Sequence, residues 1–219
     1  MTNPIIRVPI LLAALLAAWQ PSKAHAAQED EQFWLLGFAR GNLDEDVFVI
    51  VDTSLRVRDD DVGADQQTFR LTVEKGFAAN RLRAGGGFAI FETDGQTEFR
   101  PHQQFRYIRG GLDLRTRFEQ RMFPGADRTE LRIRQRVQYT HALRDDLALV
   151  GSVEWFAVAQ ARDRTRQTGT EQIRAIASVE YELTERLSIQ PGYLLWYGVR
   201  EGRQDTVSHV GQLAFNYRF

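Results

Sequence analysis

Apolar and polar residues alternate along this chain in segments of about ten residues. In the clearest segment, Leu131, Ile133 and Val137 share one parity, and arginines occupy positions between them. Successive side chains of a β-strand point to opposite faces, so each such segment predicts a strand with one apolar and one polar face. After residue 27 the sequence has no convincing helical period. The pattern therefore indicates an all-β fold.

Ten strands are predicted from residue 46 onward, and the connections between them are alternately short and long. This pattern is typical of an up-and-down barrel. We expect a transmembrane antiparallel β-barrel over residues 46–219 with about 10 strands, or with 12, because single-chain bacterial barrels have even strand numbers. Residues 27–45 are expected to be either an extra strand or a plug at the periplasmic end. The predicted strands cover residues 46–58, 66–75, 82–92, 97–108, 112–122, 128–140, 147–159, 170–182, 187–198 and 206–219.

The first 26 residues have the organisation of a signal peptide. Arg7 precedes an apolar stretch at residues 8–19, and residues 24–26 (Ala-His-Ala) form a small-x-small cleavage site. The apolar stretch is too short for a bilayer-spanning helix, which needs about 20 residues. The alternative is an N-terminal membrane anchor. We expect residues 1–26 to direct export through the inner membrane of a Gram-negative bacterium and then to be cleaved.

The composition excludes several classes of protein. The 219 residues carry a formal net charge of −1 and no cysteine, and their mean hydropathy is −0.39. The hydropathy excludes a polytopic helical membrane protein, and the charge argues against a nucleic-acid partner. Without cysteine there are no disulfides and no cysteine-ligated zinc. We expect no cofactor and no metal site. Of the 28 basic residues only Lys23 and Lys75 are lysines, so arginine dominates.

Arginines also dominate the polar parity of three consecutive predicted strands between residues 97 and 140. Nearly pure arginine with interleaved carboxylates suits a crowded barrel interior, where guanidinium groups bridge carboxylates, better than a solvent-facing row. That parity carries Arg100, Arg106, Arg115, Arg117, Arg121, Arg128, Arg132, Arg134 and Arg136, with Glu98, Asp113, Glu119 and Glu130. The lumen is predicted to be lined by Glu98, Arg100, His102, Arg115, Arg117, Glu119, Arg121, Glu130, Arg132, Arg134 and Arg136.

Two roles for these lumen residues remain open. They form either a salt-bridged ladder that fills a narrow lumen, or a weak passive channel in which the excess of arginine favours small anions or acidic oligosaccharides. Barrels of about eight strands are filled by side chains, whereas much larger ones leave a channel, and about ten strands lies between.

The end of the chain favours an outer-membrane barrel over a soluble periplasmic β-barrel binding protein. Leu213, Phe215 and Tyr217 share one parity, and the sequence stops on Phe219. This arrangement is similar to the signal that barrel-assembly machinery reads, so we expect that machinery to bind Phe219. Outer-membrane lipid and lipopolysaccharide are the other expected partners, and the barrel is expected to be a monomer. Interface girdles are expected from Phe91, Phe99, Tyr107, Tyr139, Trp155, Tyr181, Trp196, Tyr197 and Tyr217.

The arginine-rich strands resemble a known family. Residues 98–106 (EFRPHQQFR), 114–121 (LRTRFEQR) and 131–136 (LRIRQR), together with the early Trp34, are similar to the proteobacterial family named domain of unknown function 2490. A common form of the family reads E-x-R-x-W-Q-Q, and here His102 stands in the tryptophan place. The resemblance covers about residues 32–219. It implies an outer-membrane barrel and assigns no activity.

A barrel enzyme that hydrolyses lipid or peptide is the alternative from a different class. It would need a histidine beside a nucleophile, and the mature chain offers His102, His141 and His209. By parity His209 points away from Ser208, and His141 is expected in a short turn. We therefore predict no catalytic residue. Two weaker signals lie in predicted loops: Asp59, Asp60, Asp61 and Asp65 as loose Ca²⁺ ligands, and Arg162, Arg164 and Arg166 as contacts for lipopolysaccharide phosphates.

Overall fold

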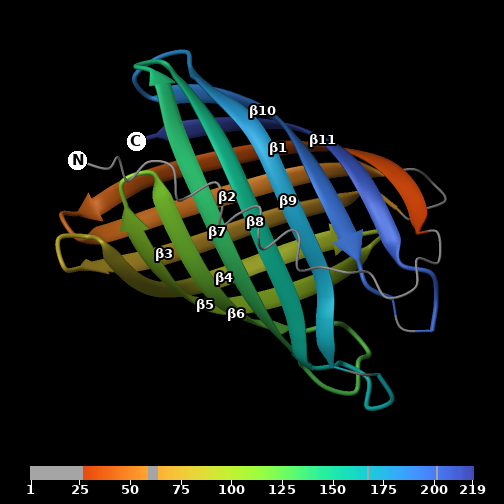
Figure 1. Cartoon of the computed structure of the whole chain (residues 1–219). Helices are drawn as coiled ribbons and strands as arrows, with labels where there is room; N and C mark the ends of the chain where they lie inside the picture. The colour runs from red at the N-terminus through yellow and green to blue at the C-terminus, as the bar shows by residue number, and fades with distance from the viewer. Residues whose placement is uncertain (1–26, 59–63, 167, 201) are drawn as a thin grey trace, which may run out of the picture.

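The structure is a computed structural model that describes residues 27–58, 64–166, 168–200 and 202–219. These residues form eleven strands that close into one barrel (Figure 1). The all-β barrel is confirmed. The strands are β1 (Gln28–Asp44), β2 (Val47–Arg58), β3 (Gln66–Phe77), β4 (Leu82–Thr93), β5 (Gln96–Arg109), β6 (Leu112–Arg121), β7 (Glu130–Arg144), β8 (Leu147–Gln160), β9 (Gly169–Glu182), β10 (Leu187–Gly198) and β11 (Thr206–Arg218). No helix in the described part of the chain is long and apolar enough to cross a membrane.

Each of the ten predicted strands corresponds to one of β2 to β11, and the eleventh strand is β1. β1 pairs antiparallel with β2 and parallel with β11, where Gln28 lies opposite Thr206 and Arg40 opposite Arg218. The barrel is therefore not antiparallel throughout. Consecutive strands run in opposite directions, so an odd number of strands leaves the first and last parallel. The count of eleven departs from the even number expected for bacterial barrels because residues 28–44 belong to the wall.

Short and long connections alternate along the chain as predicted, with one exception. The longer connections follow β2, β6 (122–129), β8 and β10, and the strand ends that they join lie at one end of the barrel, which we call the long-loop end. The exception is the β4–β5 connection at that end, a turn of two residues, Asp94 and Gly95. Both have positive φ, 49° and 68°, as a tight type I′ hairpin requires.

The outer surface of the barrel is apolar. Large hydrophobic side chains at alternate strand positions are exposed, for example Phe69 at 44%, Phe105 at 57% and Tyr193 at 47%. The buried positions between them are mostly polar, such as Glu74 and Gln104. A soluble barrel has the reverse arrangement, so this surface is suited to lipid rather than water.

The aromatic residues predicted as girdles divide between the two faces of the wall. Phe99, Tyr139 and Trp155 are exposed on the outside, as expected for interface residues. Phe91 is 3% exposed and faces the interior, and Trp196 lines an interior cavity. Their placement in a girdle is corrected because each shares the inward parity of its strand.

Two glycines let β4 approach β3 closely. A Cβ on Gly87 would lie 1.9 Å from the backbone oxygen of Leu71, and one on Gly85 would lie 2.0 Å from that of Val73. Real Cβ atoms do not approach backbone oxygen this closely, so either substitution requires the strands to shift. The glycine run therefore fits a tightly curved part of the wall.

Gly87→Ala is expected to lower the free energy of unfolding by about 1–3 kcal/mol, because the new methyl group overpacks against β3. The matched control is Gly151→Ala, since a Cβ at Gly151 meets no atom within 4 Å. Urea unfolding of the detergent-folded protein, followed by tryptophan fluorescence, measures both. Equal midpoints for the two variants would contradict the close approach of β3 and β4.

Candidate functional site

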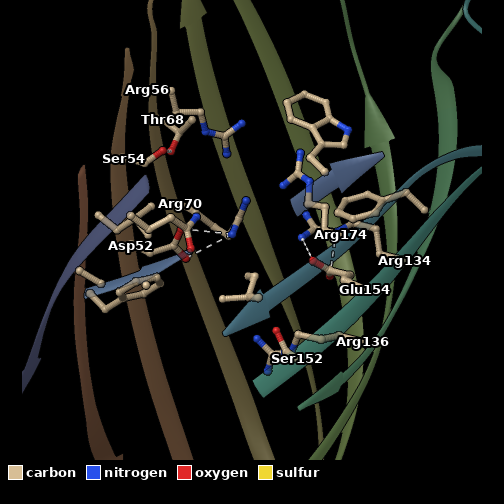
Figure 2. A pocket seen from close by; sticks show the side chains of 18 of the residues that line it. Asp52, Ser54, Arg56, Thr68, Arg70, Arg134, Arg136, Ser152, Glu154 and Arg174 are labelled. Atoms are coloured by element: carbon tan, nitrogen blue, oxygen red, sulfur yellow. Dashed lines mark hydrogen bonds and ion pairs between the residues drawn. The ribbon is translucent and has the colours of Figure 1, made fainter. Parts of the chain in front are cut away.

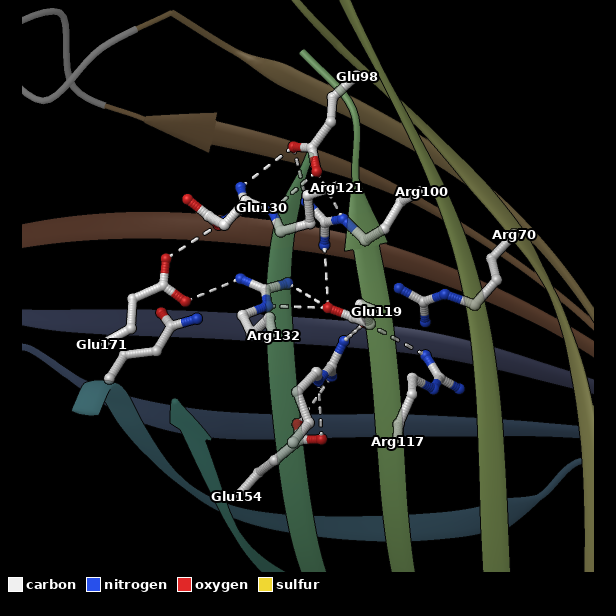
Figure 3. Close-up of polar contacts among 12 residues, drawn as sticks. Arg70, Glu98, Arg100, Arg117, Glu119, Arg121, Glu130, Arg132, Glu154 and Glu171 are labelled. Atoms are coloured by element: carbon white, nitrogen blue, oxygen red, sulfur yellow. Dashed lines mark hydrogen bonds and ion pairs between the residues drawn. The ribbon is translucent and has the colours of Figure 1, made fainter. Parts of the chain in front are cut away.

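The structure brings the predicted lumen residues together on the inner faces of β5, β6 and β7. Arg115, Arg121 and Arg136 are half-buried. The other eight are buried: Glu98, Arg100, His102, Arg117, Glu119, Glu130, Arg132 and Arg134. Since the outer wall is apolar, these charged side chains lie in the interior of the barrel, and most of them take part in one network of ion pairs (Figure 3).

Glu119 lies at the centre of this network. It is 1% exposed, and its carboxylate accepts from Arg132 at 2.6 Å and from Arg134 at 2.7 Å. The guanidinium groups of Arg100 and Arg117 lie 3.8 and 4.0 Å away. In Figure 3 the arginines surround the carboxylate from several strands. One buried carboxylate is therefore shared by four guanidinium groups, and its negative charge keeps them together.

Strand register places like charges directly opposite each other in this ladder. Arg115 lies opposite Arg136 and also opposite Arg106, and Arg117 lies opposite Arg134. Like charges at such positions are destabilising in a sheet. The arrangement therefore needs acids from other strands.

Three acids that the sequence interpretation missed supply this charge. Glu154 on β8 pairs with Arg115 at 2.7 Å, Glu171 on β9 pairs with Arg132 at 2.9 Å, and Glu74 on β3 pairs with Arg106 at 3.0 Å. Glu74 and Glu154 lie at inward positions of their strands, so parity alone would have identified them as interior residues. Glu171 has the opposite parity to the inward Gln172 and Arg174, and it reaches the lumen because a β-bulge shifts the β8–β9 register at this point. The partners of all three acids depend on barrel closure, which no local pattern encodes.

At the long-loop end of the ladder, Glu98 holds two arginines. Arg100 donates to it through Nε and Nη2, both at 2.7 Å, and Arg121 donates through Nε at 2.8 Å. Arg121 also pairs with Glu130 and Glu171. Such fork-shaped contacts fix the guanidinium planes, so this part of the lumen is rigid.

Arg128 is not part of the ladder. It precedes β7 in the 122–129 connection, is exposed, and donates to the backbone oxygen of Ala161 at 2.8 Å. Its inclusion in the interior parity is corrected because strand β7 begins two residues later, at Glu130.

Within the described ranges, no histidine hydrogen-bonds to a serine hydroxyl. His102 is buried and shares a hydrogen bond with the Thr72 hydroxyl at 3.0 Å. His209 is on the outer face and contacts the Tyr193 hydroxyl, while Ser208 points inward. His141 lies within β7 and is exposed; the prediction that it sits in a turn is corrected, because β7 continues to Arg144.

The loop signals from the sequence give no metal site among the described residues. No group of three or more histidine, cysteine, aspartate or glutamate residues in the described ranges has the geometry to hold a metal ion. The predicted acidic loop falls largely outside those ranges, since of its four aspartates only Asp65 is described, and Asp65 accepts from the Arg58 backbone. Arg162 lies against the Phe123 ring, 4.5 Å from its centroid.

Two cavities lie inside the barrel, with volumes of about 400 and 610 Å³. The smaller one lies toward the long-loop end, where Arg58 and Glu171 line it, and the larger one reaches Phe219 at the opposite end. Eleven arginines and five acidic residues line the smaller cavity; eight arginines and two acidic residues line the larger. The residues that line both are Phe38, Arg40, Asp52, Arg70, Arg115, Arg136 and Gln138.

The interior wall opposite the ladder is apolar in part. Trp34 on β1, Leu194 on β10 and Val210 on β11 form a buried cluster, and Leu36 and Ile176 pack against it. Leu36 and Ile176 line the smaller cavity, and Figure 2 shows the Arg70–Asp52 pair across that cavity from Arg174. The lumen therefore has a charged wall and a partly apolar wall.

Glu119→Gln is expected to lower the free energy of unfolding by about 3–5 kcal/mol, because it leaves buried guanidinium groups without their shared negative charge. The matched control is Asp146→Asn, which breaks an exposed pair with Arg144 and is expected to cost less than about 1 kcal/mol. Urea unfolding measures both values. A small loss for Glu119→Gln would mean that the ladder holds together without its central carboxylate.

Comparisons with known proteins support the barrel. The NanC porin matches with a TM-score of 0.51 and 10% identity, covering 77% of this chain and 84% of that one. The KdgM porin matches with a TM-score of 0.46 and 9% identity, covering 73% of this chain and 80% of that one. The KdgM porin in complex with disordered oligogalacturonate matches with a TM-score of 0.45 and 10% identity, covering 77% of this chain and 84% of that one. At 10% identity, the NanC match indicates a shared fold alone. The comparison with curated proteins finds no match.

A protein-family model matches the part of the sequence that contains the arginine-rich strands β5 to β7. The family is described as "Protein of unknown function (DUF2490)", and it matches residues 31–207. The match includes β1 from Glu31 onward and all of β2 to β10, but only the first two residues of β11. The chain belongs to this family.

Proposed function

We propose that this protein is an outer-membrane β-barrel that acts as a weak passive channel for small anions or acidic oligosaccharides. The observation that carries the proposal is the pair of cavities that share lining residues and have more arginines than acids on their walls. A channel of this kind selects solutes by the charge that lines it.

The apolar outer face supports the membrane location. Exposed Phe, Leu, Val and Tyr side chains surround the barrel. Such an extensive apolar surface is unfavourable in water and suited to contact with lipid. The closed wall satisfies the strand backbone without an edge, as the bilayer interior demands. The porin fold of NanC is in keeping with this placement.

The positive lumen supports the preference for anions. At the level where the two cavities meet, Arg70, Arg115 and Arg136 face the interior, and Arg70 pairs with Asp52 at 3.1 Å. In a narrow, low-dielectric passage such fixed charges raise the local concentration of anions and repel cations.

A structural plug is the second candidate function, and the density of the ladder favours it. Glu119 and Glu154 each hold at least two arginines, so part of the lumen is closed by side chains. The two candidates differ in one measurable property, because a plug conducts no ions.

The folded protein in a planar lipid bilayer is expected to give discrete conductance steps with a preference for anions. Substituting Arg70→Gln and Arg136→Gln together is expected to reduce that preference, because both residues line the level where the cavities meet. Arg144→Gln is the control, since its side chain is 61% exposed in an external ion pair. A silent bilayer would leave the plug, and a cation preference would contradict the proposed selectivity.

The proposed location has its own test. The protein is expected to sediment with outer membranes and to migrate differently in SDS gels before and after boiling, because a closed barrel resists the detergent until it is heated. Recovery in the soluble periplasmic fraction, with no shift on boiling, would instead support the soluble β-barrel binding protein.

A further inference from the structure

Two lumen arginines differ from those of the ladder because they lie against aromatic rings instead of carboxylates. The Arg56 guanidinium carbon is 4.1 Å from the centroid of the Trp34 ring. The Arg174 guanidinium carbon is 4.7 Å from Phe156, 4.7 Å from Trp196 and 5.2 Å from Trp34. Both arginines therefore contact the same indole, and both line the smaller cavity.

Neither arginine has an ion pair within the described part of the chain. Arg56 lies opposite Trp34 on β1 and Gln66 on β3, and it donates to the Gln66 side chain at 3.0 Å. Arg174 lies opposite Glu154, yet the Glu154 carboxylate is turned to the ladder, where it pairs with other arginines. Two positive charges thus remain without an acid partner at one level of the lumen.

The same region has more buried donors than acceptors. Arg56 Nε, Arg174 Nε and Trp196 Nε1 are buried and make no hydrogen bond to any described residue. A buried donor without an acceptor costs about 1–3 kcal/mol, and more when it is charged. In Figure 2 Arg56 and Arg174 project toward the same open space from opposite sides. The shortage of acceptors and the excess of charge both call for an oxyanion in that space.

The surroundings of these arginines add an apolar flank. Leu36, Ile176 and Trp196 line the same cavity and pack on the buried cluster of Trp34, Leu194 and Val210. A fully hydrated inorganic ion gains nothing from such a surface, whereas a ring with an apolar face does. The site therefore suits a solute that joins a carboxylate to a ring.

We propose that Arg56 and Arg174 form a binding subsite for ring-bearing carboxylates near the long-loop end of the lumen. The carboxylate lies between the two guanidinium groups, and the ring packs against the apolar flank formed by Leu36, Ile176 and Trp196. A uronic acid and an aromatic acid share this chemistry. The proposal rests on the proposed function in that it places a solute in the lumen, but binding is measured without conduction.

Isothermal titration calorimetry of the detergent-folded protein tests the proposal with glucuronate, benzoate and inorganic phosphate at equal ionic strength. At least one ring acid is expected to bind more tightly than phosphate, and the stronger one identifies the ring type. Phosphate binding as tight as both acids, or no heat from either acid, would overturn the proposal.

Variants locate the binding. Arg56→Gln and Arg174→Gln are each expected to weaken the stronger acid about tenfold or more, because each removes a charge-assisted hydrogen bond. The matched control is Arg83→Gln, which should change affinity less than about twofold. Arg83 also has no ion pair in the described ranges and lies 3.4 Å from the centroid of the Phe48 ring, but it lines the other cavity. Equal weakening by all three variants would assign binding to the general lumen charge and overturn the subsite.

Calorimetry and bilayer recording together distinguish the subsite proposal from the channel proposal. A silent bilayer with ring-acid binding retained removes the channel and leaves the subsite. Conductance without binding removes the subsite and leaves the channel. Far-UV circular dichroism checks the fold of each variant, and if one of Arg56→Gln and Arg174→Gln fails to fold, the other carries the same test, since each residue supplies one side of the site.

Discussion

The arrangement of the lumen depends on pairing buried guanidinium groups with carboxylates. An isolated buried charge costs several kcal/mol, and the attraction to a partner offsets that cost only when the hydrogen bonds are nearly complete. Glu119, Glu98 and Glu154 meet this condition by each accepting from two or more arginines. Because their partners come from several strands, the network ties β5 to β9 across the interior. The polar inner face and the apolar outer face of each strand follow from the same division of residues.

Barrel closure decides which wall faces the ladder. The parallel pairing of β1 with β11 brings Trp34 beside Val210 and Leu194, residues that lie far apart in the sequence. This seam is apolar toward the lumen, whereas β5 to β7 are charged. Arg174 lies on β9 between the two regions, and its guanidinium group contacts aromatic rings. Glu154, which lies opposite Arg174 in the sheet, forms an ion pair with Arg134 of the ladder instead. The polarity of the lumen therefore changes around its circumference.

Much of this architecture is predictable from alternation alone. The strands from residue 47 onward and the inward faces of β5 to β7 follow from parity, since a period of two assigns every side chain to a face. Parity fails where both faces are apolar, as in β10, and Trp196 was therefore placed on the wrong side. It also says nothing about direction, so the parallel closure of β1 was not predicted. Contacts such as Arg106 with Glu74 join segments 32 residues apart and depend on register.

The lumen contains more arginines than acidic residues, and stability of the fold alone does not explain this excess. A barrel interior selected for stability alone would balance its charges or replace them with apolar side chains, because a well-packed hydrophobic interior is often as stable as buried ion pairs. Here Glu119 is shared by four arginines, while Arg56 and Arg174 have no acid partner among the described residues. Uncompensated charge destabilises the fold, so its retention beside an open cavity favours a role in binding a mobile anion. The ion pairs of the ladder hold the arginines in fixed positions. The two arginines without an acid partner give the cavity a positive potential that attracts an anionic solute.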